Sequence, residues 1–401
     1  MRRTLTVALL VSLLAACSPA STGTPAATAA PTASPPGPSS TPAITQAPSI
    51  TASPRPATWT ETYSSERTAL HDVVAGPQGF IASGCTTDAS GNCLQGLLLE
   101  SPDGTAWTVA NLNGAADTQI SRVKRVDDRL FAIGLRIDNE ARKVEPVVWT
   151  SLDGRTWSRS PLTSSTSLAV TDIIDAPVAT LAVGVHAPYA SEGSGFVLWR
   201  VASDGSFGAP TDVHPETVLV MGAAWTADRF LAWGSSNPLG EVASTALLTS
   251  ADGKAWQVIP KIPAFSGSYV SQIAAGGGRL VAVGETSGST PASPRAWVSV
   301  DGSTWDGAAV PTGPGAMVTL EVERAQLVSR GREPVGAVDR PVTWTSTDGA
   351  AWTRLLPGED MPDLAGFDAL YRAVVAGRAC VAGTFSGDPA KPEPRAAIYC
   401  R

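Results

Sequence analysis

A regular series of polar and charged residues is the feature of this chain that could carry chemistry. One residue of the series falls in each of seven repeats, at Asp72, Arg122, Asp172, Gly222, Gln272, Thr319 and Tyr371. Arg122 could hold a polar ligand, together with Arg372 beside the end of the series. Alternatively, the alternating charges could pair with one another and only line a wet tunnel. We favour the charge-paired interpretation.

Hydrolysis of a glycosidic bond is the catalytic chemistry that such residues could support. It needs two carboxyl groups roughly 5 to 10 Å apart across a cleft. The sequence has enough Asp and Glu in its loops to permit this, but no motif points to a particular pair. Phosphate-binding Gly-rich loops, Gly-x-Ser-x-Gly elbows and nucleotide fingerprints are absent from the sequence. We therefore assign no catalytic residue and expect no cofactor.

An Ala-x-Gly pattern after two apolar residues marks the elements that must position the series. It ends at Gly84, Gly134, Gly184, Gly234 and Gly284, with degenerate copies at Gly331 and Gly383. Successive glycines are 50, 50, 50, 50, 47 and 52 residues apart. This regularity indicates seven repeated units, and the candidate residues lie twelve positions before each glycine, on the strand expected to be innermost.

A second motif, Ser-x-Asp-Gly-x-x-Trp, follows the glycine in most units. Its Asp and Trp residues are Asp103 and Trp107, Asp153 and Trp157, Asp252 and Trp256, Asp301 and Trp305, and Asp348 and Trp352, with a worn copy at Asp204. Asp-Gly between two apolar strands predicts a hairpin turn. Each unit then contains four strands, and seven such units predict an all-β, seven-bladed β-propeller.

The two ends of the repeat region are complementary. The seventh unit stops at its third strand, residues 396–400, whereas a lone strand around Trp59 precedes the first unit. Pairing these two strands would close the ring and remove an exposed sheet edge.

The Ser-x-Asp-Gly-x-x-Trp turns resemble the Asp-box, or BNR, repeat of sialidases and of many propellers that are not sialidases. The usual residue between Asp and Gly is missing here. The resemblance implies that the boxes are structural turns, that their Trp side chains pack between blades, and that ligands bind on the opposite face. No Phe-Arg-Ile-Pro-like segment, arginine trio or Tyr-Glu pair of a sialidase can be matched, so no catalytic residue is carried over.

The N-terminus predicts where the protein resides. Arg2 and Arg3 precede an apolar run that is shorter than the roughly 20 residues of a transmembrane helix. Leu14-Ala15-Ala16-Cys17 resembles a bacterial lipobox, which implies that residues 1–16 are a signal peptide and that Cys17 carries the lipid. Residues 17–57, rich in Ser, Thr, Pro and Ala, form an extended tether, and residues 58–401 form the propeller.

Charge and composition indicate which classes of partner the protein could bind. The 401-residue chain has a formal net charge of −7 and no basic cluster, which argues against nucleic acid. We expect a monomeric, extracytoplasmic lipoprotein, held at the bacterial cell membrane through Cys17. Its channel face would bind a protein, peptide or glycan without catalysis. The alternative is a sialidase-like glycoside hydrolase that acts on extracellular glycans.

Four cysteines remain once Cys17 is set aside. Cys85 and Cys93 flank one short loop, while Cys380 and Cys400 should face each other on adjacent strands of the seventh unit. An even number of cysteines in an exported protein favours these two disulfides, although sequence alone does not fix the connectivity. We expect no metal site, because Cys-x-x-Cys and His-x-x-x-His spacings are absent.

Overall fold

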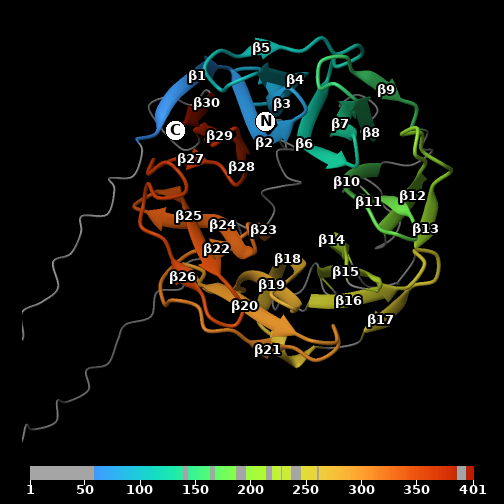
Figure 1. Cartoon of the computed structure of the whole chain (residues 1–401), viewed down its shortest axis with the longest axis vertical. Coiled ribbons are helices and arrows are strands. Elements are labelled where there is room, and N and C mark those ends of the chain that lie inside the picture. The colour runs from blue at the N-terminus through green and yellow to red at the C-terminus, as the bar shows by residue number, and fades with distance from the viewer. Residues whose placement is uncertain are drawn as a thin grey trace, which may run out of the picture.

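Seven antiparallel sheets stand around a central axis in the structure of this protein, a computed structural model (Figure 1). The structure describes residues 58–138, 143–162, 168–186, 196–213, 219–226, 228–235, 245–259, 262–385 and 394–401. The predicted seven-bladed β-propeller is confirmed. The predicted signal peptide, the lipid site at Cys17 and the tether lie outside the described residues. Within the described ranges, no helix has the length and apolar character needed to cross a membrane.

Blades 1 to 4 each have four strands, ordered from the axis outward. Blade 1 contains β2 (Thr68–Gly76), β3 (Gly79–Thr87), β4 (Cys93–Ser101) and β5 (Thr108–Val109). Blade 2 contains β6 (Thr118–Val126), β7 (Arg129–Asp138), β8 (Lys143–Ser151) and β9 (Ser158–Ser160). Blade 3 contains β10 (Leu168–Ile174), β11 (Thr180–His186), β12 (Phe196–Val201) and β13 (Thr211–Val213). Blade 4 contains β14 (Leu219–Trp225), β15 (Phe230–Ser235), β16 (Thr245–Ser250) and β17 (Gln257–Ile259).

Blades 5 to 7 depart slightly from this plan. Blade 5 follows a short 3₁₀ turn (Pro263–Phe265) and contains β18 (Ser268–Gly276), β19 (Arg279–Thr286), β20 (Pro294–Ser299) and β21 (Asp306–Gly307). In blade 6 the inner strand is split into β22 (Ala316–Met317) and β23 (Glu321–Glu323), followed by β24 (Gln326–Val335), β25 (Val338–Ser346) and β26 (Thr353–Arg354). Blade 7 has a split inner strand, β27 (Phe367–Asp368) and β28 (Arg372–Val375), then β29 (Arg378–Phe385) and β30 (Arg395–Cys400).

The N-terminal strand closes the ring, as the sequence predicts. β1 (Thr60–Glu66) pairs antiparallel with β30, from Thr60 opposite Cys400 to Glu66 opposite Arg395. Disulfides join Cys380 to Cys400 and Cys85 to Cys93. The first of these ties β29 to the C-terminal strand that receives β1. Chain closure therefore rests on strand pairing between segments more than 300 residues apart, beside a covalent bond.

The repeated glycine has a structural reason. Each inner strand of blades 1 to 5 carries a one-residue β-bulge, at His71 in blade 1. The bulge presses the inner strand onto the glycine of the second strand, so that a Cβ on Gly84 would lie 1.9 Å from the carbonyl oxygen of Ala69. No side chain fits in that space, which explains why the glycine recurs in every unit.

Apolar layers between neighbouring blades form the core. Trp157 packs with Ile81 of blade 1 and Trp149 of blade 2, and Trp305 packs in the same way between blades 4 and 5. The turn tryptophans thus lie between blades, in the packing role that the sequence suggested. Each sheet is covered on both faces by its neighbours, so burial holds the ring together without a single central core.

The Ser-x-Asp-Gly turns share one hydrogen-bond pattern. In blade 2, Gly154 N donates to Ser151 Oγ over 2.9 Å, and Asp153 Oδ1 accepts from the backbone N–H groups of Arg155 and Thr156 over 2.8 Å. The glycine has a φ of 80°, which favours glycine at this position. The backbone N–H groups lower the pKa of Asp153 from 3.8 to about 2. The carboxylate is thus part of the turn.

We predict that Asp153→Asn weakens the acid sensitivity of folding. A carboxyl group whose pKa is depressed in the folded state stabilises it above the unfolded pKa, and this contribution is lost as pH falls from about 4 towards 2. The amide keeps an acceptor oxygen but does not titrate. Urea unfolding at pH 7, 4 and 2.5 measures the difference, with the exposed Asp306→Asn as control. An identical pH dependence in the Asp153 variant and the wild type would contradict the assignment.

Candidate functional site

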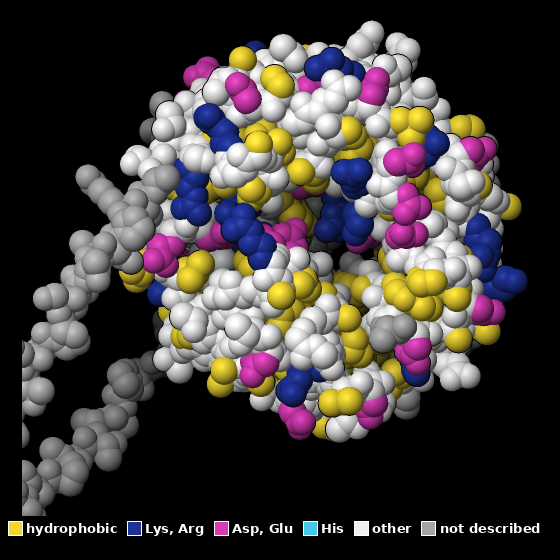
Figure 2. Space-filling view, in the orientation of Figure 1, with side chains coloured by type: hydrophobic (Ala, Val, Ile, Leu, Met, Phe, Trp, Pro, Cys, Tyr) yellow, Lys and Arg dark blue, Asp and Glu magenta, His cyan; other side chains and the backbone are white. Residues whose placement is uncertain are grey.

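The inner strands carry the candidate residues around the central channel. β2, β6, β10, β14, β18, β23 and β28 lie nearest the axis (Figure 1). Lys, Arg, Asp and Glu side chains gather around the hollow at the centre of the ring (Figure 2). The candidate residue of blades 1 to 5 follows the bulge directly and pairs with the residue before the repeated glycine, as Asp72 pairs with Ser83. In these five blades the bulge therefore fixes the position of the candidate side chain.

Asp172 is the acceptor for two cations of the preceding blade. Arg122 Nη1 lies 3.1 Å and Lys124 Nζ 3.2 Å from its carboxylate oxygens. The side chains of Arg122 and Asp172 are only 22% and 15% exposed. Burial opposes ionisation of Asp172, but Arg122 and Lys124 outweigh it and hold its pKa below the usual range. Asp172 in turn raises the pKa of Arg122. The pair is charged and satisfied within the protein.

Asp72 and Gln272 both bind the backbone of the next blade. Asp72 Oδ2 accepts from Val123 N over 2.9 Å, and Gln272 Oε1 accepts from Leu320 N over 2.8 Å. Asp72 is 1% exposed, and its Oδ1 has no hydrogen-bond partner in the described part of the chain. Burial raises the pKa of Asp72 to about 6, although Arg122 acts in the opposite direction. These side chains act as links between blades.

Tyr371 of blade 7 lies close to Arg122 of blade 2. The Arg122 guanidinium carbon is 5.4 Å from the centre of the Tyr371 ring, which is within the range of a cation–π contact. Burial raises the pKa of the Tyr371 hydroxyl, although Arg122 acts in the opposite direction. Arg122 thus contacts both an aspartate and a tyrosine of this protein.

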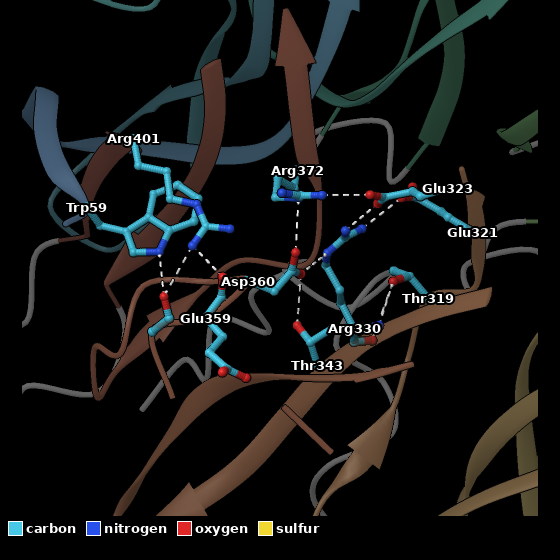
Figure 3. Close-up of polar contacts among 11 residues, drawn as sticks. Trp59, Thr319, Glu321, Glu323, Arg330, Thr343, Glu359, Asp360, Arg372 and Arg401 are labelled. Atoms are coloured by element: carbon cyan, nitrogen blue, oxygen red, sulfur yellow. Dashed lines mark hydrogen bonds and ion pairs between the residues drawn. The ribbon is translucent and has the colours of Figure 1, made fainter. Parts of the chain in front are cut away.

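A larger charge network joins blades 6 and 7 (Figure 3). The fully buried Arg330 pairs with Asp360 at 2.8 Å, with Glu321 at 2.8 Å and with Glu323. Arg372 contacts two of the same carboxylates, Glu323 at 2.6 Å and Asp360 at 3.2 Å. Burial opposes ionisation of Asp360, but Arg330 and Arg372 hold its pKa below the usual range. Two guanidinium groups and three carboxylates therefore neutralise most of their charge among themselves.

The network also reaches the ring closure. The indole N–H of Trp59 donates to the Gly358 carbonyl oxygen over 3.1 Å. The Arg401 guanidinium carbon lies 4.7 Å from the centre of the Trp59 ring, and Arg401 also donates to the carbonyl of Glu359. The connection between blades 6 and 7 thus contacts both ends of the propeller.

Sequence reasoning found Arg372 but missed Arg330, Glu321, Glu323 and Asp360. A signal for Arg330 was present, because it stands directly before the repeated glycine, where the other blades have uncharged residues. No comparable signal marks Asp360, which lies in the irregular connection between β26 and β27. The structure does not bring Gln272 into either charge cluster.

One unexpected group of potential metal ligands lies in blade 1. A ring nitrogen of His71 and the sulfur atoms of Cys85 and Cys93 all lie within 4.8 Å of one another. Both sulfurs belong to the disulfide, so neither is a thiolate that could bind a metal. Burial lowers the pKa of His71 to about 4, against the opposing effect of Asp368.

The loop face opposite the turns also contains internal pairs. Glu333, near the end of β24, accepts hydrogen bonds from Arg354 and, over 2.6 Å, from Arg340 Nε. Arg340 Nη1 also contacts Asp363 at 3.0 Å. A cavity of about 340 Å³ lies elsewhere, on the turn face between blades 1 and 2.

Comparison with solved structures shows the fold alone. No known protein family and no curated protein matches the chain. The β-propeller domain of the trilobed protease from Pyrococcus furiosus is similar, with 10% identity and a TM-score of 0.50 over 83% of this chain and 94% of that one. A Trypanosoma rangeli sialidase in complex with 2,3-difluorosialic acid gives 14% identity and a TM-score of 0.47, over 82% of this chain. This match spans 59% of the sialidase, so the chain covers little more than half of its length.

We predict opposite effects from neutralising the two channel aspartates. Asp172→Asn leaves Arg122 and Lys124 without their carboxylate and costs about 2 kcal/mol of stability, less than for a fully buried pair. Asp72→Asn removes a buried charge and keeps the bond to Val123 N, so the variant is at least as stable at pH 7 as the wild type.

The pH dependence of unfolding provides the check. A carboxyl group whose pKa rises from 3.8 to about 6 on folding makes the native state less stable as pH increases through that interval. The Asp72→Asn variant should lack this decline in urea unfolding experiments. A large loss of stability in this variant at pH 7 would show that the Asp72 charge is needed.

Proposed function

We propose that this protein is a lipid-anchored bacterial surface propeller that serves as a non-catalytic binding or scaffold module for a protein, peptide or glycan. The observation that carries the proposal is the internal pairing of the channel charges. Asp172 is neutralised by Arg122 and Lys124, and Arg372 by Glu323 and Asp360. A catalytic acid or nucleophile must be free to contact substrate, whereas these groups hold neighbouring blades together.

A rigid ring suits presentation of loops to a partner. Adjacent blades are linked by apolar layers and by side chain to backbone bonds such as Asp72 to Val123. Loops held by such a frame lose little conformational entropy on binding. We place the partner on the loop face opposite the turns, at the channel mouth, and assign the turns to the Asp-box type by their sequence.

Anchoring forms the second part of the proposal. The signal peptide and the lipobox-like Cys17 imply export and lipid attachment, and the Pro-rich segment up to residue 57 would hold the propeller away from the membrane. The disulfides between Cys85 and Cys93 and between Cys380 and Cys400 suit an oxidising, extracytoplasmic location.

A sialidase-like glycoside hydrolase is the alternative. One observation favours it, because the pKa of the buried Asp72, near 6, is suited to a general acid. Asp72 accepts a hydrogen bond from the backbone N–H group of Val123, and Glu321, whose charge acts on Asp72, is paired with Arg330. Among the described residues, Asp72 therefore has no unpaired carboxylate partner for the two-carboxylate reaction.

A thermal-shift screen of the full-length chain tests the binding function. The probes are cell-wall fragments, sialosides, other oligosaccharides and peptides. A ligand present at 100 times its Kd adds about 2.7 kcal/mol, which corresponds to a rise in Tm of about 4 °C for a domain of this size. Each ligand that gives a shift is then tested for turnover. Hydrolysis by the wild type that is lost in Asp72→Asn would contradict the proposal and support the alternative.

Lipid attachment is tested by expressing the full-length chain in bacteria supplied with an alkyne fatty acid. The wild type and the matched control Ser18→Ala should be labelled and should sediment with membranes. Cys17→Ser should be unlabelled and should leave the membrane fraction, because it lacks the thiol to which the lipid would be attached. Equal labelling of all three chains would refute anchoring at Cys17.

A further inference from the structure

The cavity of about 340 Å³ lies at the junction of blades 1 and 2 on the turn face. Gly79, Ile81 and Glu100 of blade 1 line one side, and the turn residues Asp153 and Arg155 of blade 2 line the other. Its volume is typical of a site for a small ligand. The residues at this junction differ from those at the corresponding positions of the other blades.

The other junctions show what fills the corresponding space. Five residues before the repeated glycine, at the start of the second strand, several blades have an arginine that interacts with the turn aspartate of the following blade. The interacting residues are Arg378 with Asp103, Arg129 with Asp204 and Arg279 with Asp348. Arg229 forms its ion pair with Asp228 and has a weaker electrostatic interaction with Asp301. The contact is close, because a Cβ on Gly104 would lie 3.2 Å from Arg378 Nε.

In blade 3 the arginine beside the next turn comes from a different strand. Blade 3 has Ala179 where blades 2, 4, 5 and 7 have the arginine. Arg200, on the neighbouring strand opposite Leu181, reaches the turn of blade 4 instead and donates from Nη2 to the Asp252 carbonyl oxygen over 3.1 Å. Five of the six turns therefore have an arginine from the preceding blade.

The turn of blade 2 is the exception. Blade 1 has Gly79 at the first position, and at the position of Arg200 it has Glu100, which pairs with Ile81 in the equivalent register. The chain has no Lys or Arg from Thr68 to Ser121, so blade 1 has no cation to offer. The cavity occupies the space that an arginine fills elsewhere.

The backbone around Gly79 excludes a side chain at this position. Gly79 has a φ of 134°, and a Cβ there would lie 2.2 Å from the Ser101 carbonyl oxygen. A side chain cannot be accommodated without moving β3 away from the end of β4. The absence of a side chain at this position is therefore a property of the backbone of blade 1.

The charge of the cavity is unbalanced. Glu100 Oε1 is buried and has no hydrogen-bond partner in the part of the chain that the structure describes. Burial raises the pKa of Glu100, although Arg155 and a hydrogen bond from the Trp157 side chain act in the opposite direction. Backbone N–H groups keep Asp153 ionised. Arg155 is exposed at the rim. With Glu100 ionised, two carboxylates face one guanidinium, and the unpaired oxygen lacks a donor.

We propose that this cavity binds an alkylguanidinium group, supplied by an arginine side chain of a partner or by a small organic cation. The group would occupy the place of the missing arginine, donate to Glu100 and lie against the Asp153 turn. A planar guanidinium matches a carboxylate with two parallel hydrogen bonds, which an ammonium group cannot form. The site lies on the face opposite the proposed partner surface at the channel mouth, so it stands independently of that function.

Calorimetric titration of the full-length protein with butylguanidinium chloride at pH 7.5 tests the proposal. The wild type and the control Glu66→Gln, an exposed carboxylate on β1, should bind with the same Kd. Glu100→Gln should bind at least tenfold more weakly, as should Glu100→Thr, which introduces the residue that stands in this register at Thr150, Thr249 and Thr345. Butylammonium should bind more weakly than butylguanidinium to the wild type.

The pH profile separates a direct role of Glu100 from a structural one. Wild-type affinity should fall as pH drops through the raised pKa of Glu100, and this dependence should be absent from Glu100→Gln. Circular dichroism and Tm establish that the variants fold. If the Glu100 variants do not fold, Asn111→Trp at the exposed rim replaces them, because the indole blocks the cavity and should abolish binding.

Titration with an arginine peptide distinguishes the two possible sources of the guanidinium group. Tighter binding of acetyl-Gly-Arg-Gly-amide than of butylguanidinium supports a protein partner, and equal binding supports a free organic cation. The proposal is overturned if the wild type binds neither probe at millimolar concentration, or if Glu100→Gln and a folded Asn111→Trp bind as well as the wild type.

Discussion

Seven twisted sheets can close into a ring only if their inner strands converge, and one repeated contact makes this possible. In each regular blade the bulged inner strand rests on the Cβ-less glycine of the second strand, where an added Cβ would lie 1.9 Å from a carbonyl oxygen at Gly84 and 1.8 Å at Gly284. The same bulge directs the next residue, such as Asp72 or Gln272, to the backbone of the following blade. The channel residues of blades 1 to 5 are thus placed by the contact that closes the ring.

The junction of blades 6 and 7 uses a different interaction. Apolar side chains of both blades meet at most junctions, but here Arg330 is buried with Asp360 and two glutamates. A buried guanidinium is tolerated because every donor group that it presents meets a carboxylate. The connection that supplies Asp360 also contacts Trp59 and Arg401. Charge pairing therefore joins the last two blades next to the strand exchange that closes the ring.

Blade 1 departs from the repeat at its junction with blade 2. Arginines from one blade cover the turns of the next at five junctions, and their regularity makes the exception in blade 1 visible. Gly79 and Glu100 there replace a cation with a cavity and an unpaired carboxylate oxygen. The cavity thus lies where blade 1 lacks the arginine that lies beside the turn at five other junctions.

The sequence by itself determined the number of blades, the hairpin turns, the closing strand and the cysteines that lie opposite each other. These features depend on local backbone requirements, a glycine without a Cβ and an Asp-Gly turn, which recur at a fixed spacing. Only the tertiary structure decided that Arg122 pairs with Asp172, that Arg330 finds Asp360 in an irregular connection, and that nothing fills the space beside Gly79. These contacts join different blades. The residues that meet, such as Arg122 and Asp172, lie up to about fifty positions apart and share no local sequence pattern. The spacing of the repeats therefore does not determine which side chains pair.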